Sequence, residues 1–281
     1  MTDPLESRHR FSVLSKSRRR TDAGPRGVRR GAYLLPSALT MGNMFCGYAC
    51  IVHAMRSEFH AAAAFIGVAI VLDMLDGRVA RMTGTTSAFG LEFDSLADVV
   101  SFGVAPAILS FAWGLHPLGR IGWAAGFLFV AAAAVRLARF NIQSASHQDK
   151  RYFVGMPSPA AACIPAATVF AYPQGFQSTT HAVAVLAMVI VPALTMVSTV
   201  RFRSFKTLDL QTRRSSAVLV LVALVLVLVA AEPQYSLVAL AYTYLASGFI
   251  GYAWMRSHRR HGADDTVRET ETHEHRDTKA L

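Results

Sequence analysis

Long apolar segments alternate with short polar connections along most of the chain. The segments cover 33–55, 59–77, 94–115, 120–140, 157–175, 181–200, 215–231 and 235–255. Most of them reach the length of about 20 residues that an α-helix needs to cross a bilayer. The fifth is the least regular, because Pro157, Pro159 and Pro165 each remove a backbone donor. The pattern predicts an all-α, polytopic membrane helix bundle with about eight transmembrane helices.

The composition agrees with a lipid environment. Of the 281 residues, 53% are hydrophobic and 16% are charged, whereas a soluble domain has roughly 25% charged residues. We expect one membrane domain over 33–255, between a basic cytoplasmic tail over 1–32 and a polar cytoplasmic tail over 256–281. No short apolar run with a small-residue cleavage site follows the first tail, so we expect the first helix to be retained.

The basic residues predict how the helices are oriented. A net charge of +10 would also suit a nucleic-acid partner. With eight helices and a cytoplasmic N-terminus, however, every Lys and Arg except Arg56 and Arg120 falls on the cytoplasmic side. Cytoplasmic loops are enriched in basic residues, so we expect both termini in the cytoplasm and need no nucleic acid to explain the charge. The basic rim favours anionic lipid headgroups as neighbours.

Four aspartates lie at or within the ends of the second and third segments. Asp73 and Asp76 are three positions apart and share one helix face. Asp94 and Asp98 are four positions apart and do the same. An Asp near a helix centre costs about 2.5 to 3.5 kcal/mol on insertion, so we expect a compensating cation. The alternative, helix caps and surface ion pairs, suits a lone Asp better than this array.

Clustered carboxylates suit particular metal ions. Mg²⁺ and Mn²⁺ prefer hard oxygen ligands to His or Cys. Two such ions about 3.5 to 4 Å apart clamp the attacking and leaving oxygens of a phosphoryl transfer. The four aspartates therefore predict a site for Mg²⁺ or Mn²⁺, with two ions, that acts on a phosphate group.

Small residues and one arginine accompany the aspartates. Gly77 and Ala80 follow the first pair on nearly the same face, and Gly90 precedes the second pair by one turn. Small side chains would let a bulky diphosphate approach the backbone. Arg81 would neutralise phosphate charge through forked hydrogen bonds. We therefore assign Gly77, Ala80, Arg81 and Gly90 to diphosphate binding.

The chain resembles the CDP-alcohol phosphatidyltransferase family at eight fixed positions, Asp73-x2-Asp76-Gly77-x2-Ala80-Arg81-x8-Gly90-x3-Asp94-x3-Asp98. The resemblance implies an enzyme that binds a CDP-linked lipid at a dimetal site, transfers its phosphatidyl group to an alcohol and releases CMP. By position it assigns metal binding to the first three aspartates. It makes Asp98, the fourth carboxylate of the metal site, the general base. A homodimer is also expected from this resemblance.

Three further stretches are similar to the bacterial membrane-embedded phosphatidylserine synthases of that family. They are Arg136-Leu137-Ala138-Arg139-Phe140-Asn141, Gly155-Met156-Pro157-Ser158-Pro159-Ala160, and Met196-Val197-Ser198 with Arg201-Phe202-Arg203-Ser204-Phe205-Lys206. This similarity implies CDP-diacylglycerol and L-serine as substrates. It also implies a multi-pass protein of the bacterial inner membrane, with its active site at the cytoplasmic side.

The first segment resembles the opening pattern of the family through Leu35-Pro36-Ser37-Ala38-Leu39-Thr40-Met41-Gly42-Asn43. Ser37 stands where the family usually has Asn. Thr40 and Asn43, three positions apart, would reach the nucleotide. The alternative is that both bond neighbouring helices, as polar residues in membrane helices often do.

Recognition of serine requires a fixed cation, because serine carries a carboxylate and an ammonium beside its hydroxyl. Arg136 and Arg139, with Asn141 just beyond, lie at the predicted cytoplasmic end of the fourth segment. Arginine suits bidentate binding of a carboxylate, so we assign these three residues to serine binding. The alternative is anchoring by positive charge, and Arg136, which lies deeper, is the better candidate.

Two other functions fit parts of the pattern. A family member that uses glycerol 3-phosphate or inositol phosphate as acceptor would share the aspartates but lack the Arg-Leu-Ala-Arg-Phe-Asn run. A divalent-cation or proton transporter would also place acids in membrane helices. Acids at one membrane end, beside Gly and Arg suited to phosphate, favour the enzyme.

Overall fold

Helices make up nearly all of the chain that the structure describes. The structure is a computed structural model and describes residues 26–84, 87–145, 153–176, 178–198, 201–202 and 215–251. Within these residues the only strands are β1 (Phe153–Val154) and β2 (Arg201–Phe202), which form one small sheet. The predicted all-α class is therefore confirmed. Of the predicted tails over 1–32 and 256–281, only residues 26–32 belong to the described part of the chain.

Each predicted apolar segment coincides with a helical stretch. The helices are α1 (Arg26–Met55), α2 (Phe59–Thr83), α3 (Ala88–Asp98), α4 (Ala105–Ser110), α5 (Arg120–Ala145), α6 (Ser158–Ala171), α7 (Thr179–Val197) and α8 (Ser215–Ala231), and one further helix covers 233–251. The ends differ from the prediction. α1 begins within the expected tail, and α2 continues past the apolar run until Gly84. Gly84 ends α2 at a φ of 63° and donates its N–H to the Ala80 carbonyl, as glycine does in left-handed helix caps.

Five helical stretches in the described part of the chain are long and apolar enough to cross a membrane. They are Leu34–Met55, Phe59–Thr83, Ala88–Leu118, Arg120–Gln143 and Thr179–Val197. α6 is apolar but has only 14 residues. A helix of that length spans about 21 Å, less than the hydrocarbon core of about 30 Å. The structure thus supports five of the eight predicted crossings, and the exact number stays a prediction.

The third crossing is not a uniform α-helix. α3 passes into a π-helical segment, η1 (Val99–Val104), then into α4, a second π-helical segment, η2 (Phe111–Leu115), and a 3₁₀ turn, η3 (His116–Leu118). π-Helical turns are rare and occur frequently at functional sites. η1 begins directly after Asp98.

Small residues bring the helix backbones close together. The buried alanines include Ala62, Ala63, Ala69, Ala105, Ala132, Ala133, Ala161 and Ala162. Within lipid, helices associate through such close packing rather than through a hydrophobic driving force. A close approach joins α1 to η1, where a Cβ on Gly47 would lie 2.8 Å from the Cα of Ser101. Only glycine fits at this position of α1.

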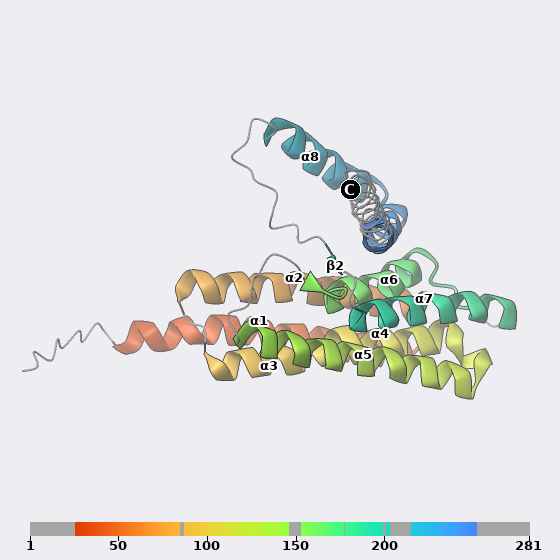
Figure 1. Cartoon of the computed structure of the whole chain (residues 1–281), viewed down its shortest axis with the longest axis horizontal. Coiled ribbons are helices and arrows are strands. Elements are labelled where there is room, and N and C mark those ends of the chain that lie inside the picture. The colour runs from red at the N-terminus through yellow and green to blue at the C-terminus, as the bar shows by residue number, and fades with distance from the viewer. Residues whose placement is uncertain are drawn as a thin grey trace, which may run out of the picture.

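Figure 1 shows the helices of the bundle lying side by side along the long axis of the molecule, with α8 apart from them. The helix over 233–251 returns to the bundle. Its Ala241 is buried in the common core, and its Tyr242 hydroxyl lies 3.2 Å from the Thr168 hydroxyl of α6. This helix therefore adds a wall to the bundle beside α6.

A small corner joins the start of α6 to the end of α7. Phe153 pairs with Phe202 and Val154 with Arg201 in the two-stranded antiparallel sheet. Gly155 follows at a φ of 86°, and a Cβ there would collide with the Met196 carbonyl oxygen. Two of the three stretches quoted for their resemblance to phosphatidylserine synthases thus meet in space.

Candidate active site

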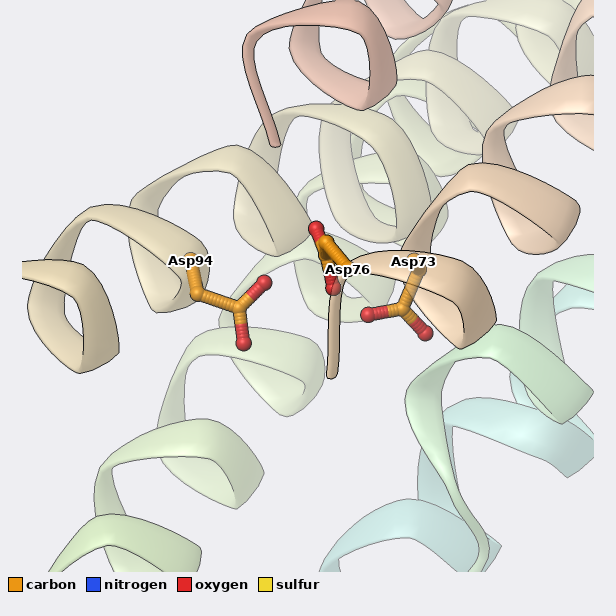
Figure 2. A group of neighbouring side chains, drawn as sticks. All are labelled: Asp73, Asp76 and Asp94. Atoms are coloured by element: carbon orange, nitrogen blue, oxygen red, sulfur yellow. The ribbon is translucent and has the colours of Figure 1, made fainter. Parts of the chain in front are cut away.

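Three aspartates from two helices face one another. Figure 2 shows Asp73 and Asp76 on α2 and Asp94 on α3 directing their carboxylates into one space. Oxygen atoms of the three lie within 4.8 Å of one another. Asp76 is buried, and the other two are half-buried. Like charges so close together repel strongly away from bulk water, so the arrangement calls for a bound cation.

The donor set fits a divalent metal ion. The Oδ1 atom of Asp94 is buried and has no hydrogen-bond partner among the described residues. A buried acceptor without a donor is costly, and coordination of a metal would satisfy it. Carboxylate oxygens are the ligands that Mg²⁺ and Mn²⁺ prefer. The cluster of Asp73, Asp76 and Asp94 is thus able to hold such an ion.

Asp98 lies beside this cluster and has a different environment. Its side chain is 8% exposed, and its Oδ1 accepts a hydrogen bond of 3.2 Å from Asn43 Nδ2. It is close enough to Asp73 and Asp94 to interact with them electrostatically. One carboxylate is therefore held by an amide, while the three others face a common space.

The polar residues of α1 contact the aspartates directly. Thr40 donates a hydrogen bond of 3.0 Å to Asp76 Oδ2. Asn43 is fully buried, and its main-chain oxygen accepts a bond of 2.9 Å from the Ser101 hydroxyl. Thr40 and Asn43 therefore bond neighbouring helices, which is the alternative that the sequence left open for them. Contact with the nucleotide stays a prediction. The buried Oδ1 of Asn43 has no hydrogen-bond partner among the described residues.

The small residues of the motif occupy two distinct places. A Cβ on Gly77 would lie 3.8 Å from the guanidinium nitrogens of Arg81, whose side chain is exposed. Gly90 lies at the start of α3, where its N–H donates to the Ser87 hydroxyl at 3.0 Å. Ala80 is half-buried on α2. Gly77 and Arg81 are thus neighbours on the metal-cluster helix, whereas Gly90 belongs to the cap of α3.

Arg136 of α5, assigned to serine binding from the sequence, interacts electrostatically with Asp73 and Asp98. Its Nη1 donates a 2.8 Å bond to the hydroxyl of Ser158, which is fully buried. Its guanidinium carbon lies 6.0 Å from the centre of the Phe140 ring. Its Nε is buried and has no hydrogen-bond partner in the part of the chain that the structure describes. The guanidinium interacts electrostatically with Asp98 and Tyr244. The Arg136 guanidinium is held on one side by Ser158 and keeps Nε as an unused donor, so it is suited to binding an anionic group.

The other two residues assigned to serine do not converge on Arg136. Arg139 is exposed and donates a bond of 3.1 Å to the Val197 carbonyl at the end of α7. Asn141 donates a bond of 2.9 Å to the Ser95 hydroxyl of α3. In the structure, Arg139 fastens α5 to α7 and Asn141 fastens α5 to α3, so Arg136 alone faces the aspartates.

Two residues near the site were not singled out from the sequence. The Ser101 hydroxyl donates a hydrogen bond to the main-chain oxygen of Asn43. In the sequence, this residue could have been noticed as a hydroxyl within an apolar segment, one turn beyond Asp98. Tyr244, on the helix over 233–251, lies beside Arg136. Its segment offered little beyond hydrophobicity, so its place next to α5 had no signature in the sequence.

Comparison with known proteins assigns a family. Residues 33–197 match the model of the CDP-alcohol phosphatidyltransferase family. The CDP-diacylglycerol–serine O-phosphatidyltransferase of Helicobacter pylori strain 26695 is 37% identical over 79% of this chain and 92% of its own length. The enzyme of the same name from Mycobacterium tuberculosis H37Rv is 43% identical over 49% of this chain and 50% of its own length. The archaetidylserine synthase of Methanothermobacter thermautotrophicus is 39% identical over 46% of this chain and 54% of its own length.

We expect Asp94→Asn to weaken binding of Mn²⁺ to the purified protein by about ten-fold or more, because changes even in residues that only orient metal ligands cost that much. The change removes one anionic oxygen at nearly constant volume. Electron paramagnetic resonance of free Mn²⁺ measures the affinity without any need for turnover. The matched control is Glu92→Gln, on the exposed side of the same helix. Equal affinity in both variants would remove Asp94 from the metal site.

Proposed function

The chain belongs to the CDP-alcohol phosphatidyltransferase family, and we propose that it transfers the phosphatidyl group of CDP-diacylglycerol to the hydroxyl of L-serine, releasing CMP. The main support for serine as the acceptor is the position of Arg136. Its guanidinium is hydrogen-bonded to Ser158 and interacts electrostatically with Asp98. There an acceptor carboxylate would be held with its hydroxyl near a base. The names of the relatives from Helicobacter and Mycobacterium support the same acceptor.

Asp73, Asp76 and Asp94 would hold two Mg²⁺ or Mn²⁺ ions. When bound, such ions neutralise the diphosphate and stabilise the charge that develops on its oxygens. Arg81 adds a guanidinium next to Gly77, where a phosphate can approach the backbone. These residues bind and orient the lipid nucleotide.

The remaining steps fall to residues on α1, α3 and α5. Asp98 takes the proton from the serine hydroxyl as this oxygen attacks the phosphorus that bears the diacylglycerol, in line with the departing CMP. Asn43 holds one carboxylate oxygen of Asp98 and leaves the other for the proton. Arg136 pairs with the serine carboxylate and thereby sets the position of the hydroxyl.

The alternative acceptors find less support. Glycerol 3-phosphate and inositol phosphate each carry a phosphate group, which has more negative charge than a carboxylate. At this site it would be paired only with the half-buried guanidinium of Arg136. None of the relatives described above is named for either acceptor. A transporter is not proposed, because the family is one of transferases.

We further propose that the protein crosses a bacterial inner membrane about eight times, with both termini and the active site on the cytoplasmic side. The distribution of Lys and Arg supports this orientation, since only Arg56 and Arg120 fall outside. Arg81 and Gly84 mark the same end of the bundle as the aspartates. The homodimer is a prediction from the family resemblance alone.

The direct test measures CMP release from CDP-diacylglycerol by the purified protein with Mg²⁺ or Mn²⁺. We expect turnover with serine to exceed turnover with glycerol 3-phosphate or inositol phosphate by about 10²-fold or more, because a site built around one set of polar groups strongly rejects acceptors that leave it unpaired. Asp94→Asn is the inactive control. Faster turnover with either phosphorylated acceptor would overturn the choice of serine.

A second test separates the general base from a metal ligand. Asp98→Asn should lower kcat by about 10² to 10⁴, as the loss of a general base does, and leave binding of CDP-diacylglycerol intact. Asn43→Ala should lower kcat less. In the Asp98→Asn background it should add little, because two residues that act through one interaction are not additive. If Asp98→Asn weakens metal and lipid-nucleotide binding as well, Asp98 is a ligand instead.

A third test concerns Arg136. Leaving the serine carboxylate unpaired should cost roughly 2 to 5 kcal/mol, so Arg136→Leu should raise the KM for serine and leave the KM for CDP-diacylglycerol unchanged. Arg136→Lys keeps the charge but loses the planar fork, and it should also be impaired while inserting normally into the membrane. Unchanged serine kinetics in both variants would exclude Arg136 from acceptor binding.

A further inference from the structure

A side-chain hydrogen bond links helix α5 to helix α3 close to the candidate active site. Asn141 of α5 donates from Nδ2 to the hydroxyl oxygen of Ser95, at 2.9 Å. Both side chains are half-buried. Asn141 is one of the residues assigned from the sequence to serine binding, yet the proposed reaction makes no use of its bond to Ser95. A residue expected to touch the substrate thus joins two helices of the protein.

The direction of this bond follows from a second hydrogen bond. The Ser95 hydroxyl donates to the Leu91 carbonyl oxygen, one turn earlier on α3, at 3.0 Å. A serine hydroxyl has one proton to donate and two lone pairs that accept, so Ser95 accepts from Asn141. The amide nitrogen of Asn141 must therefore face Ser95, and the network of bonds assigns the orientation of the whole amide.

On α3, Ser95 lies among the residues proposed for catalysis. It follows Asp94 directly and precedes Asp98 by three positions. Residues three positions apart are neighbours on the surface of a helix, so Ser95 lies beside the proposed general base. A bond to Ser95 therefore holds the part of α3 that carries both Asp98 and one carboxylate of the metal cluster.

On α5, Asn141 lies near the residue proposed to bind the acceptor. It follows Arg136 by five positions, which corresponds to about 7.5 Å along a helix axis. Arg136 donates to Ser158 of α6 at 2.8 Å, whereas Asn141 donates to α3. Helix α5 is thus bonded to α6 through one of these side chains and to α3 through the other.

The two bonded helices carry different halves of the proposed reaction. α3 carries Asp94 and Asp98, which act on the lipid nucleotide and on the attacking hydroxyl. α5 carries Arg136, which would hold the carboxylate of serine. The hydroxyl must lie near Asp98 and near the phosphorus at the same time, so the separation of α3 and α5 determines whether the two substrates are aligned. A misplacement of about 1 Å costs a factor of about 10² in rate.

We propose that Asn141 is a positioning residue for the transfer step, which acts through its bond to Ser95 and sets the distance between the serine held by Arg136 and the carboxylates of α3. The proposal rests on the proposed function and deepens it, because it assigns control of the rate to a residue that touches neither substrate. A hydrogen bond suits this task, since it fixes both a distance and a direction, whereas apolar association is non-directional.

The test removes the bond from either end. Asn141→Leu replaces the amide by an apolar side chain of similar size, and Ser95→Ala removes the hydroxyl. Both should lower kcat with serine by about ten-fold or more, as a small misplacement of reacting groups does. The KM values for serine and for CDP-diacylglycerol should stay unchanged, because the bond acts only when the two substrates react. The double variant should be no slower than the single variants, since all three lose the same interaction.

Three controls separate this effect from a general loss of structure. Ser95→Thr keeps the hydroxyl and should retain most of the wild-type kcat. Ile142→Ala changes an exposed neighbour of Asn141 and should leave the kinetics unchanged. Binding of Mn²⁺, measured by electron paramagnetic resonance without turnover, should keep its wild-type affinity in Asn141→Leu and Ser95→Ala, because α3 remains bonded to α1 through Asn43 and Asp98.

Other outcomes overturn the proposal. A raised KM for serine in Asn141→Leu but not in Ser95→Ala would place the amide at the acceptor, as the assignment from the sequence has it. Losses that multiply in the double variant would mean that the two residues act separately, and wild-type kcat in both single variants would leave the bond without a role in transfer. A weaker Mn²⁺ affinity together with a lower kcat would make the bond a general support of the fold. If the wild-type protein releases no CMP with serine, the proposed function itself fails, and this result is recognised before any variant is assayed.

Discussion

Mutual repulsion of carboxylates is the constraint around which the bundle is organised. Asp73, Asp76 and Asp94 approach within 4.8 Å in a helical protein of the membrane type. Such a cluster is unfavourable without cations, and helices free to slide would separate it. Hydrogen bonds from α1 oppose that separation, because Thr40 donates to Asp76 and Asn43 donates to Asp98. Helix α1 is thus a fixed support for charged groups that lie on α2 and α3.

The support depends on how closely α1 and η1 approach. Gly47 leaves room for Ser101, and Ser101 bonds the main chain of Asn43. The π-helical turn that follows Asp98 belongs to the same contact. The direction of the proposed general base is therefore set by backbone packing as well as by a side-chain bond. Rigid elements of this kind hold a reactive group better than a loop does.

Much of this arrangement could be predicted from local patterns. Apolar segments located the helices, and the spacing of the aspartates predicted that they share helix faces and meet across a short connection. Helix ends were less predictable, because α2 continues beyond its apolar run until Gly84 provides a left-handed cap. The spacing of residues along a helix also predicts which helix face they share, but it does not predict which residues of other helices they contact. The role of Thr40 and Asn43 therefore stayed open until the structure placed them beneath the aspartates.

Contacts between distant segments were beyond the reach of the sequence. Arg136 and Arg139 lie three positions apart, yet one faces Ser158 and the other the end of α7. The start of α6 and the end of α7, which supply these two partners, meet at Gly155. Tyr244 reaches Arg136 only because the last helix folds back onto α6. None of these partners is near in sequence, so no periodicity could have identified them.

The return of the last helix also bears on the timing of biosynthesis. A chain that has emerged from the ribosome as far as residue 198 already contains Arg136 and the four aspartates of the candidate site, but not the helix over 233–251 that carries Tyr244. In the finished structure α8 lies apart from helices α1 to α7 (Figure 1). The surroundings of Arg136 are thus completed only by a segment that is synthesised late. A nascent chain would contain the four carboxylates and their support on α1 before Tyr244 could reach Arg136.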